Sequence, residues 1–464
     1  MRDIVEQYTI KPIPEAARHG RARSLFPFWF TANSSAFTIV LGAIGIELGL
    51  GLVPTILAIV AGGAVGGVFM AYHSAQGPRL GLTQLVQSRA QFGFYGALLP
   101  NILVWLIFLG YIVGENVLAA QAMSGLWHIS YADAMAVASF VTWLVVFFGY
   151  RVMHDVNRVV AVAALILFAV LLVRLLQRTG GATVDMTAFR FSTWLLFFSI
   201  NVSGQVGWAP YVSDYSRYLP SGTSIRQSFW YTYLGSVSSA VIFAGLGAVA
   251  GSIALRSLEF NSVGYLAGLI PGVTWLAIIV LLASIVAGNA INLYSPLLTG
   301  VAIASRDGGA APGAAVRGIG TAVIMAVTGY LATVVSANFV TDVSDFIAFL
   351  LYIVIPWSAI NLADYYVIRH GRYDVPAIFR ASGRYGAFNW RTVAVFIVGV
   401  AAEVPFMNAA YPSFEGPAAV ALNGADISWL VGFVVTGALY WLVAPRTAGP
   451  ANAVTGTAGR AAAD

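Results

Sequence analysis

The stretch GWAPYVSDYSRYLP, residues 207–220, interrupts a long apolar segment with Gly207 and Pro210 and then ends in charged residues. A membrane-spanning helix that is broken in this way exposes backbone N–H and C=O groups within the bilayer. Such exposure is tolerated only where surrounding protein or a water-filled cavity satisfies those groups. The stretch is therefore a candidate binding site for a transported solute.

The composition of the rest of the chain is that of a membrane protein. Of the 464 residues, 59% are hydrophobic and 9% are charged, whereas a soluble domain carries about 25% charged residues. The mean hydropathy is +0.81. Runs of roughly 17 to 25 apolar residues cross a bilayer core of about 30 Å. They predict an all-α polytopic membrane protein with twelve transmembrane helices, at residues 26–49, 53–73, 96–125, 131–150, 158–176, 191–213, 229–253, 272–302, 317–335, 343–367, 391–411 and 427–445.

The basic residues predict the orientation of the chain. Most of the 24 Lys and Arg fall in the terminal segments or in loops after even-numbered spans; the exceptions are Arg174, Arg178, Arg190 and Arg256. Because loops rich in Lys and Arg stay in the cytoplasm, we expect both termini on the cytoplasmic side of the cell inner (plasma) membrane. The formal charge of +5 is then a topology signal and does not indicate a nucleic-acid partner.

Enzymatic and metal-dependent functions find no support in the motifs. The chain has no cysteine, which excludes disulfides, thiolate metal sites and cysteine nucleophiles. It has no nucleophile elbow, no phosphate-binding glycine loop and no His/Asp/Glu group at metal-ligand spacing. We therefore expect no enzyme, no metal and no cofactor.

The organisation is simple along the chain. Residues 1–25 are predicted to form a solvated cytoplasmic arm, residues 26–446 a single transmembrane transport domain, and residues 447–464 a disordered cytoplasmic tail. Gly62 and Gly66 in the second span, like Gly247 and Gly251 in the seventh, have the spacing that lets helices pack closely. We expect this packing within one chain, as a monomer; dimerisation is the alternative.

Two spans are interrupted, and they are five helices apart. The first contains Asn33, Ser34 and Ser35, and the sixth contains the 207–220 stretch. Units with an odd number of helices have opposite orientations, as in inverted repeats whose broken helices meet at a midplane site. This predicts repeat one at about 26–176, repeat two at about 191–367 and two extra helices at about 391–445. The alternative is that Gly and Pro only kink packed helices.

Few ionisable residues fall within the spans. Glu115 is the most central, and Tyr111 lies one turn before it, so both share a helix face. An aromatic ring beside a carboxyl group suits stacking of a flat heterocycle and acceptance of hydrogen bonds from its N–H groups; a structural, protonated Glu is the alternative. At the cytoplasmic ends, Asp155, Asp214 and Asp364 are expected to pair with nearby arginines, Arg151 or Arg158, Arg217 and Arg369.

The eighth span carries Ser284, Gly288 and Asn292 on one stripe, with Asn289 beside it. The two amides supply donors and acceptors for a ligand, or alternatively hold two helices together. All five histidines fall in loops or at span ends, which argues against a buried histidine proton relay.

Three motifs in these spans are similar to known proteins. The runs GWAPYVSDYSRYLP at 207–220, AGNAINLYSPLLTG at 287–300 and PWSAINLADYYVIRHGRYD at 356–374, with NWRTVAVFIVGVAAEVPFM at 389–407, resemble the nucleobase cation symporter type 1 family of purine, cytosine and allantoin permeases. The resemblance covers nearly the whole chain. It implies a leucine-transporter-like fold, with a five-plus-five inverted repeat and two additional helices, and alternating access without enzymatic activity.

The resemblance also implies a substrate site. Members sandwich a planar heterocycle between aromatic groups of helices three and six. By position, the substrate-binding residues here are Tyr111 and Glu115 on helix three, Gly204, Gln205 and Trp208 on helix six, and Asn289 and Asn292 on helix eight. Gln205 replaces an aromatic residue of some relatives and could form a two-point amide pair with a base.

The residues of helix eight that would bind a cation differ from those of sodium-driven relatives. Where they place hydroxyl residues on helix eight, this chain has Ala287 and Gly288, with only Ser284 nearby. We therefore predict proton coupling through Glu115, because a carboxyl group away from water favours its neutral form. The alternative is a sodium-coupled symporter, with Ser284 among the ligands, of allantoin, hydantoin, thiamine or another vitamin. Two further candidates are an amino-acid or amine symporter and a non-transporting membrane receptor or scaffold.

Overall fold

A computed structural model describes residues 10–147, 150–179, 183–304, 314–335, 339–408 and 414–445. The described residues form helices and loops, with a single isolated β-bridge between Asn408 and Glu415, so the all-α prediction is confirmed. The helices are α1 (Leu25–Ala32), α2 (Ala36–Glu47), α3 (Leu52–Ser74), α4 (Gln76–Leu80), α5 (Gln84–Gln87), α6 (Arg89–Phe92), α7 (Leu98–Trp127), α8 (Tyr131–Phe147), α9 (Tyr150–Thr179), α10 (Phe191–Val206), α11 (Ala209–Ser216), α12 (Ile225–Gly268), α13 (Thr274–Ala304), α14 (Ala314–Val335), α15 (Phe339–Leu362), α16 (Trp390–Glu403), α17 (Pro417–Ala421) and α18 (Ser428–Val443).

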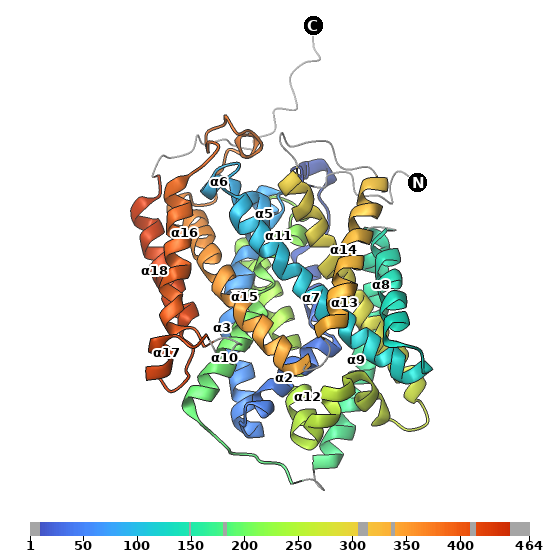
Figure 1. Cartoon of the computed structure of the whole chain (residues 1–464). Helices are drawn as coiled ribbons and strands as arrows, with labels where there is room; N and C mark the ends of the chain where they lie inside the picture. Colours follow the sequence, from blue (N-terminus) through green and yellow to red (C-terminus); the bar gives the residue numbers. More distant parts are fainter. Residues whose placement is uncertain are drawn as a thin grey trace.

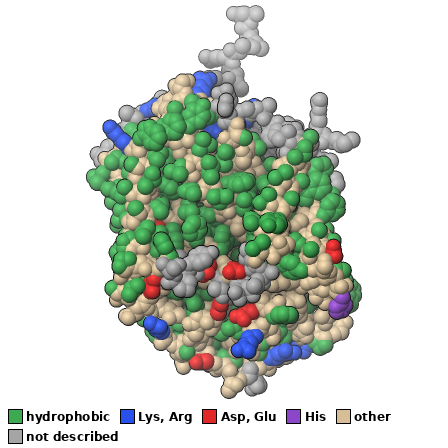
Figure 2. Space-filling view, viewed as in Figure 1, with side chains coloured by type: hydrophobic (Ala, Val, Ile, Leu, Met, Phe, Trp, Pro, Cys, Tyr) green, Lys and Arg blue, Asp and Glu red, His purple; other side chains and the backbone are tan. Residues whose placement is uncertain are grey.

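Within the described part of the chain, six helices are long and apolar enough to cross a membrane, and a seventh span results if α1 and α2 count together. Three shorter apolar helices accompany them. Figure 2 shows hydrophobic side chains over the middle of the bundle and Lys and Arg toward its two ends. Leu57, Val162 and Val434 are among the exposed apolar side chains, which suits contact with lipid. The chain is a multi-pass membrane protein, and the count of twelve spans stays a prediction.

Both predicted interruptions are present. Helices α1 and α2 meet at 61°, across a break at Asn33 to Ser35, where Ser35 is extended and its hydroxyl caps α2 by accepting from the N–H of Thr38 at 3.3 Å. Helices α10 and α11 are separated by a turn at Gly207 and Trp208. Pro210 follows directly, and it has no N–H to continue the α-helical hydrogen bonds.

Glycines bring the broken helices against their neighbours. A Cβ at Gly247 of α12 would overlap the carbonyl of Ile39 on α2, and one at Gly62 of α3 would overlap the carbonyl of Phe198 on α10. Gly66 is equally close to Val202 of α10. These predicted small-residue positions are therefore used for packing inside one chain.

Two boundaries differ from the predictions. The span predicted at 391–411 ends as an α-helix at Glu403 and continues as a 3₁₀ turn, Val404–Phe406, because Pro405 lacks the N–H that the helix needs. The amino-terminal arm is not solvated throughout: Ile10 and Ile13 are buried, and the N–H of Ile13 donates to the carbonyl of Gly81 at 3.0 Å. The predicted tail at 447–464 lies outside the described residues, as do the side chains of the predicted pair of Asp155 with Arg151 or Arg158.

The first and last described segments lie at the same end of the bundle, beside α5 and α6 (Figure 1). Ile10 packs with Leu82 and Val86 near α5 and with Tyr365 and Ile378 beyond the end of α15. The two helix breaks lie within the bundle, where α2 contacts α12 and α15, and α10 contacts α3 and α15. This arrangement brings the two irregular segments together.

Candidate functional site

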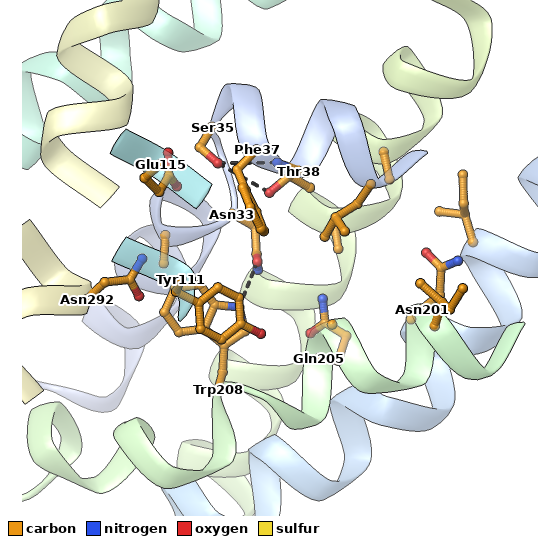
Figure 3. A pocket seen from close by; sticks show the side chains of 18 residues that line it. Asn33, Ser35, Phe37, Thr38, Tyr111, Glu115, Asn201, Gln205, Trp208 and Asn292 are labelled. Atoms are coloured by element: carbon orange, nitrogen blue, oxygen red, sulfur yellow. Dashed lines mark hydrogen bonds between the residues drawn. The ribbon is translucent and has the colours of Figure 1, made fainter. Parts of the chain in front are cut away.

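A buried cavity of about 40 Å³ lies between the two helix breaks. Its walls come from α2, α3, α7, α10, α12 and α13 and from the turns that end α1 and α10. Six residues that the sequence singled out line it together: Tyr111, Glu115, Gly204, Gln205, Trp208 and Asn292. All but Gly204 are labelled in Figure 3. Segments that are distant in sequence thus converge on one site.

Tyr111 and Trp208 place two aromatic rings on one side of the cavity. Their centroids are 6.2 Å apart and their planes differ by 17°, so the rings are close to parallel. Phe37 and Phe346 pack edge-on against the Tyr111 ring, at 5.9 and 5.2 Å. The Tyr111 hydroxyl lies directly over Gly207, where a Cβ would overlap it. Glycine at the helix break therefore permits the position of Tyr111.

Glu115 lies one helical turn from Tyr111 and is 4% exposed. The hydroxyl of Ser35, at the amino terminus of α2, faces its carboxyl group, while Oε2 has no hydrogen-bond partner among the described residues. A Cβ at Gly288 would lie 3.3 Å from Oε1, so the carboxyl group lies against the bare backbone of α13. The site thus places a sparsely bonded carboxyl group between a helix break and a glycine.

The amides differ in their roles. Asn292 lines the cavity, whereas Asn289 lies outside the lining and donates from Nδ2 to Oδ1 of Asn116 at 2.8 Å, which joins α13 to α7. Oε1 of Gln205 accepts from the Ser236 hydroxyl at 2.7 Å, so a two-point amide pair with a ligand would require this bond to break. Ser284 is also outside the lining, and its hydroxyl donates to the carbonyl of Leu281 in its own helix at 2.7 Å.

Several lining residues were not assigned to the site from sequence. Asn33, Ser35, Phe37 and Thr38, around the first break, line the cavity, as does Asn201 of α10. The residues around the first break could have been assigned to the site from sequence, because the polar run that marks the helix interruption lies among them. Asn201 lies one turn before Gln205, and helical periodicity alone could have indicated it.

Other polar residues form structural networks away from the cavity. His73 lies at a span end as predicted but is fully buried. Its Nδ1 accepts from Nε2 of Gln84 at 3.1 Å, and its Nε2 is 2.8 Å from the Ser358 hydroxyl. The predicted pair of Asp364 and Arg369 is present at 3.0 Å. Within the described ranges, no group of three or more His, Asp or Glu could hold a metal ion.

Comparisons with known proteins agree with this architecture. The family described as permeases for cytosine/purines, uracil, thiamine and allantoin matches residues 12–432. The chain is 36% identical over 445 residues to the putative purine-cytosine permease YxlA of Bacillus subtilis, covering 95% of this chain and 96% of that protein. The chain belongs to the nucleobase cation symporter family. This permease is therefore a transporter and not an enzyme.

A more distant relative and two solved structures are also similar to this chain. The purine-cytosine permease fcyB of Emericella nidulans is 27% identical, with 95% of this permease and 88% of that protein covered. Mhp1, a family transporter solved with bromovinylhydantoin bound, has a TM-score of 0.73 at 20% identity, over 94% of each chain. Its inward-facing form gives 0.74 at 19% identity, over 94% of this chain and 92% of that one. The permease therefore shares the fold of Mhp1.

Proposed function

We propose that this permease imports a purine or pyrimidine base, or a related nitrogen heterocycle, across the inner membrane by alternating access in symport with a proton. The observation that carries the proposal is the near-parallel pair of Tyr111 and Trp208 beside the carboxyl group of Glu115. Two parallel aromatic faces offer stacking to a flat ring, and the carboxyl group and amides offer hydrogen bonds to its edge. The names of the family and of the bacterial and fungal relatives support the same substrate class.

The cavity between the helix breaks is too small to hold a base in this structure. Carbon atoms in contact lie about 3.5 to 4.0 Å apart, so a ring held between two others needs about 7 to 8 Å. The observed 6.2 Å between Tyr111 and Trp208 must widen by about 1 to 2 Å. The cavity of about 40 Å³ is also well below the roughly 150 Å³ that admits benzene. Substrate binding thus requires the helix breaks to move apart.

The proposed architecture has twelve spans, two inverted repeats and cytoplasmic termini, and acts as a monomer in the bilayer without a nucleic-acid partner. The two helix breaks that line one cavity support the repeats. The shared location of the described chain ends supports termini on one side of the membrane (Figure 1).

Proton coupling rests on Glu115. Its carboxyl group lies against Gly288 of α13, which offers no side-chain oxygen to a sodium ion. Sodium ions require several oxygen ligands, and Ser284, the hydroxyl residue nearest on α13, lies outside the cavity lining. A carboxyl group that gains and loses a proton supplies the coupling without such a cage.

Substitutions of Tyr111 test the substrate site. Tyr111→Ala removes a stacking surface worth about 1 to 3 kcal/mol per base, so affinity for a transported base should fall roughly 5- to 150-fold. Tyr111→Phe retains the ring, and the lost hydroxyl has no hydrogen-bond partner among the described residues, so this variant should bind like the unmodified permease. Uptake of labelled adenine, guanine, hypoxanthine, cytosine and uracil into proteoliposomes measures both. Failure to take up any base, with uptake of allantoin, hydantoin or thiamine, would contradict the proposal.

A further inference from the structure

A chain of hydrogen bonds links the two helix breaks behind the cavity. The indole N–H of Trp208 donates to Oδ1 of Asn33 at 2.9 Å (Figure 3). Nδ2 of Asn33 donates to the Ser236 hydroxyl at 2.9 Å and to the Ser236 carbonyl at 3.3 Å. The Ser236 hydroxyl donates to Oε1 of Gln205 at 2.7 Å. Four side chains from the first break, α12 and the second break therefore form one continuous chain.

The indole N–H of Trp208 determines which group donates and which accepts in every hydrogen bond of this chain. An indole nitrogen is only a donor, so Asn33 must turn its oxygen toward Trp208 and its NH₂ group toward Ser236. Ser236 accepts that hydrogen, and its own hydroxyl hydrogen goes to the oxygen of Gln205. The separation of 2.7 Å is the usual length for an O–H···O bond. The amide of Gln205 is thereby left with its nitrogen, a donor, for the cavity that it lines.

Burial makes this orientation costly to reverse. Asn33, Ser236 and Gln205 are each 5% exposed or less, so bulk water does not replace a broken bond. If the Gln205 amide rotated, Asn33 and Gln205 would both donate to one hydroxyl, and the hydrogen of Ser236 would lose its acceptor. An unpaired buried group disfavours that state by roughly 5- to 150-fold.

We propose that Trp208, Asn33 and Ser236 are positioning residues that hold Gln205 as a hydrogen-bond donor, so that the site selects bases that present acceptor atoms toward α10. This inference rests on the proposed function and adds a specificity to it. An oxo group beside a ring nitrogen accepts a hydrogen bond from the Gln205 amide. An amino group at the same position would place one donor against another, the NH₂ group of Gln205. Oxo bases are thus preferred over their amino counterparts.

The test compares pairs of bases related by the exchange of an amino group for an oxo group. Hypoxanthine and adenine differ in this way at one ring position and in the hydrogen on the adjacent ring nitrogen, as do uracil and cytosine. Each unlabelled base competes in proteoliposomes with uptake of the labelled base that the permease transports fastest, and the ratio of inhibition constants is the readout. The unmodified permease should favour the oxo member at least fivefold in the pair to which the transported base belongs.

Ser236→Ala is the decisive variant. Without the serine hydroxyl the Gln205 amide can rotate and offer either group, so the oxo-to-amino ratio should fall to within about twofold of unity. Trp208→Phe keeps a ring but removes the N–H that sets the direction, and should lower the ratio in the same way even if it weakens both bases. Gln205→Glu, which presents only acceptors, should invert the preference.

Ser239→Ala is the matched control. Ser239 lies one turn after Ser236 on α12, is equally buried, and its hydroxyl donates to the carbonyl of Phe30 rather than to Gln205. The control should keep the ratio of the unmodified permease. An unchanged ratio in Ser236→Ala, equal changes in both serine variants, or no preference in the unmodified permease would overturn the inference while uptake of bases still upholds the proposed function. Uptake of no base at all would instead overturn the proposed function, and this inference with it.

Discussion

Asp364 accepts hydrogen bonds from four side chains, whereas the carboxyl group of Glu115 faces the Ser35 hydroxyl and its Oε2 has no hydrogen-bond partner among the described residues. Both carboxyl groups are buried. The donors to Asp364 come from α6, the residue after the π-helical turn that follows α15, the next loop and α18, at 2.7 to 3.0 Å: Gln91, Arg369, Tyr373 and Tyr440. One buried acid is thus held by several partners, and the other has few.

The surroundings of Asp364 explain why it is structural. It is the second residue of a π-helical turn, Ala363–Ile368, and its bonds join several elements at one end of the bundle. Burial lowers the pKa of Arg369, but the negative charge of Asp364 and the neighbouring Tyr373, Tyr440 and Tyr385 together outweigh burial and hold that pKa above its ordinary value. A charge with this many partners stabilises one arrangement. A carboxyl group with few partners, such as Glu115, has fewer hydrogen bonds to break when it moves.

The largest effect is expected when the carboxylate of Asp364 is replaced. Asp364→Asn leaves the guanidinium of Arg369 buried without its ion partner, which costs about 3 to 5 kcal/mol of stability. Thermal unfolding of the purified permease should show a clear loss of Tm. Asp374→Asn is the control: its Oδ1 accepts from the N–H of Ala377 at 3.2 Å, an Asn can accept the same bond, and the cost should stay below about 1 kcal/mol. Equal unfolding temperatures for the two variants would contradict the structural role of Asp364.

A smaller effect is expected from one donor of the same network. Tyr440→Phe removes a 2.8 Å hydrogen bond to Asp364, and bonds to charged groups contribute about 1.5 to 3 kcal/mol. Tyr365→Phe removes a hydroxyl that has no hydrogen-bond partner in the described parts of the chain, so it should leave stability nearly unchanged. Denaturant or thermal unfolding of the two variants gives the comparison directly. A loss of stability in Tyr365→Phe as large as in Tyr440→Phe would contradict the contribution of the Tyr440 hydrogen bond.

The smallest effect on stability is expected at Glu115. Glutamine has the shape of a neutral carboxyl group, so Glu115→Gln should change the free energy of unfolding by less than about 1 kcal/mol. The same type of substitution, acid to amide, is thus expected to be damaging at Asp364 and nearly silent at Glu115. A loss of several kcal/mol in Glu115→Gln would show that Glu115 is a fixed ion in the resting state.

The sequence reveals these features to different degrees. Runs of apolar residues indicate the helices because each helix must cross the apolar core of the membrane. Pro210 and the run from Asn33 to Ser35 indicate the breaks because they disrupt local hydrogen bonding. The end of α16 at Glu403 was missed, since a hydrophobicity count takes no account of the missing N–H of Pro405. Local signals therefore locate the elements and the broken segments.

Contacts between distant segments were not predictable in this way. Trp208 and Asn33 are 175 positions apart, and Asn33 and Ser236 are 203 apart, so no local pattern pairs them. Asn289 and Asn292 lie three positions apart on the same predicted span, yet only Asn292 lines the cavity. The rotation of α13 about its axis decides between them, and packing against α7 sets that rotation. Such partners follow from tertiary packing and not from spacing.

The most direct test of the account is accumulation of a transported base in proteoliposomes with an imposed pH gradient and no sodium. One proton per substrate and a gradient of one pH unit support up to about tenfold accumulation, because one unit corresponds to about 1.4 kcal/mol. The unmodified permease and Glu403→Gln, a control at a buried glutamate outside the cavity lining, should both accumulate base. Glu115→Gln should only equilibrate it. Accumulation by Glu115→Gln, or accumulation by the unmodified permease only with a sodium gradient, would contradict the assignment of Glu115 as the coupling residue.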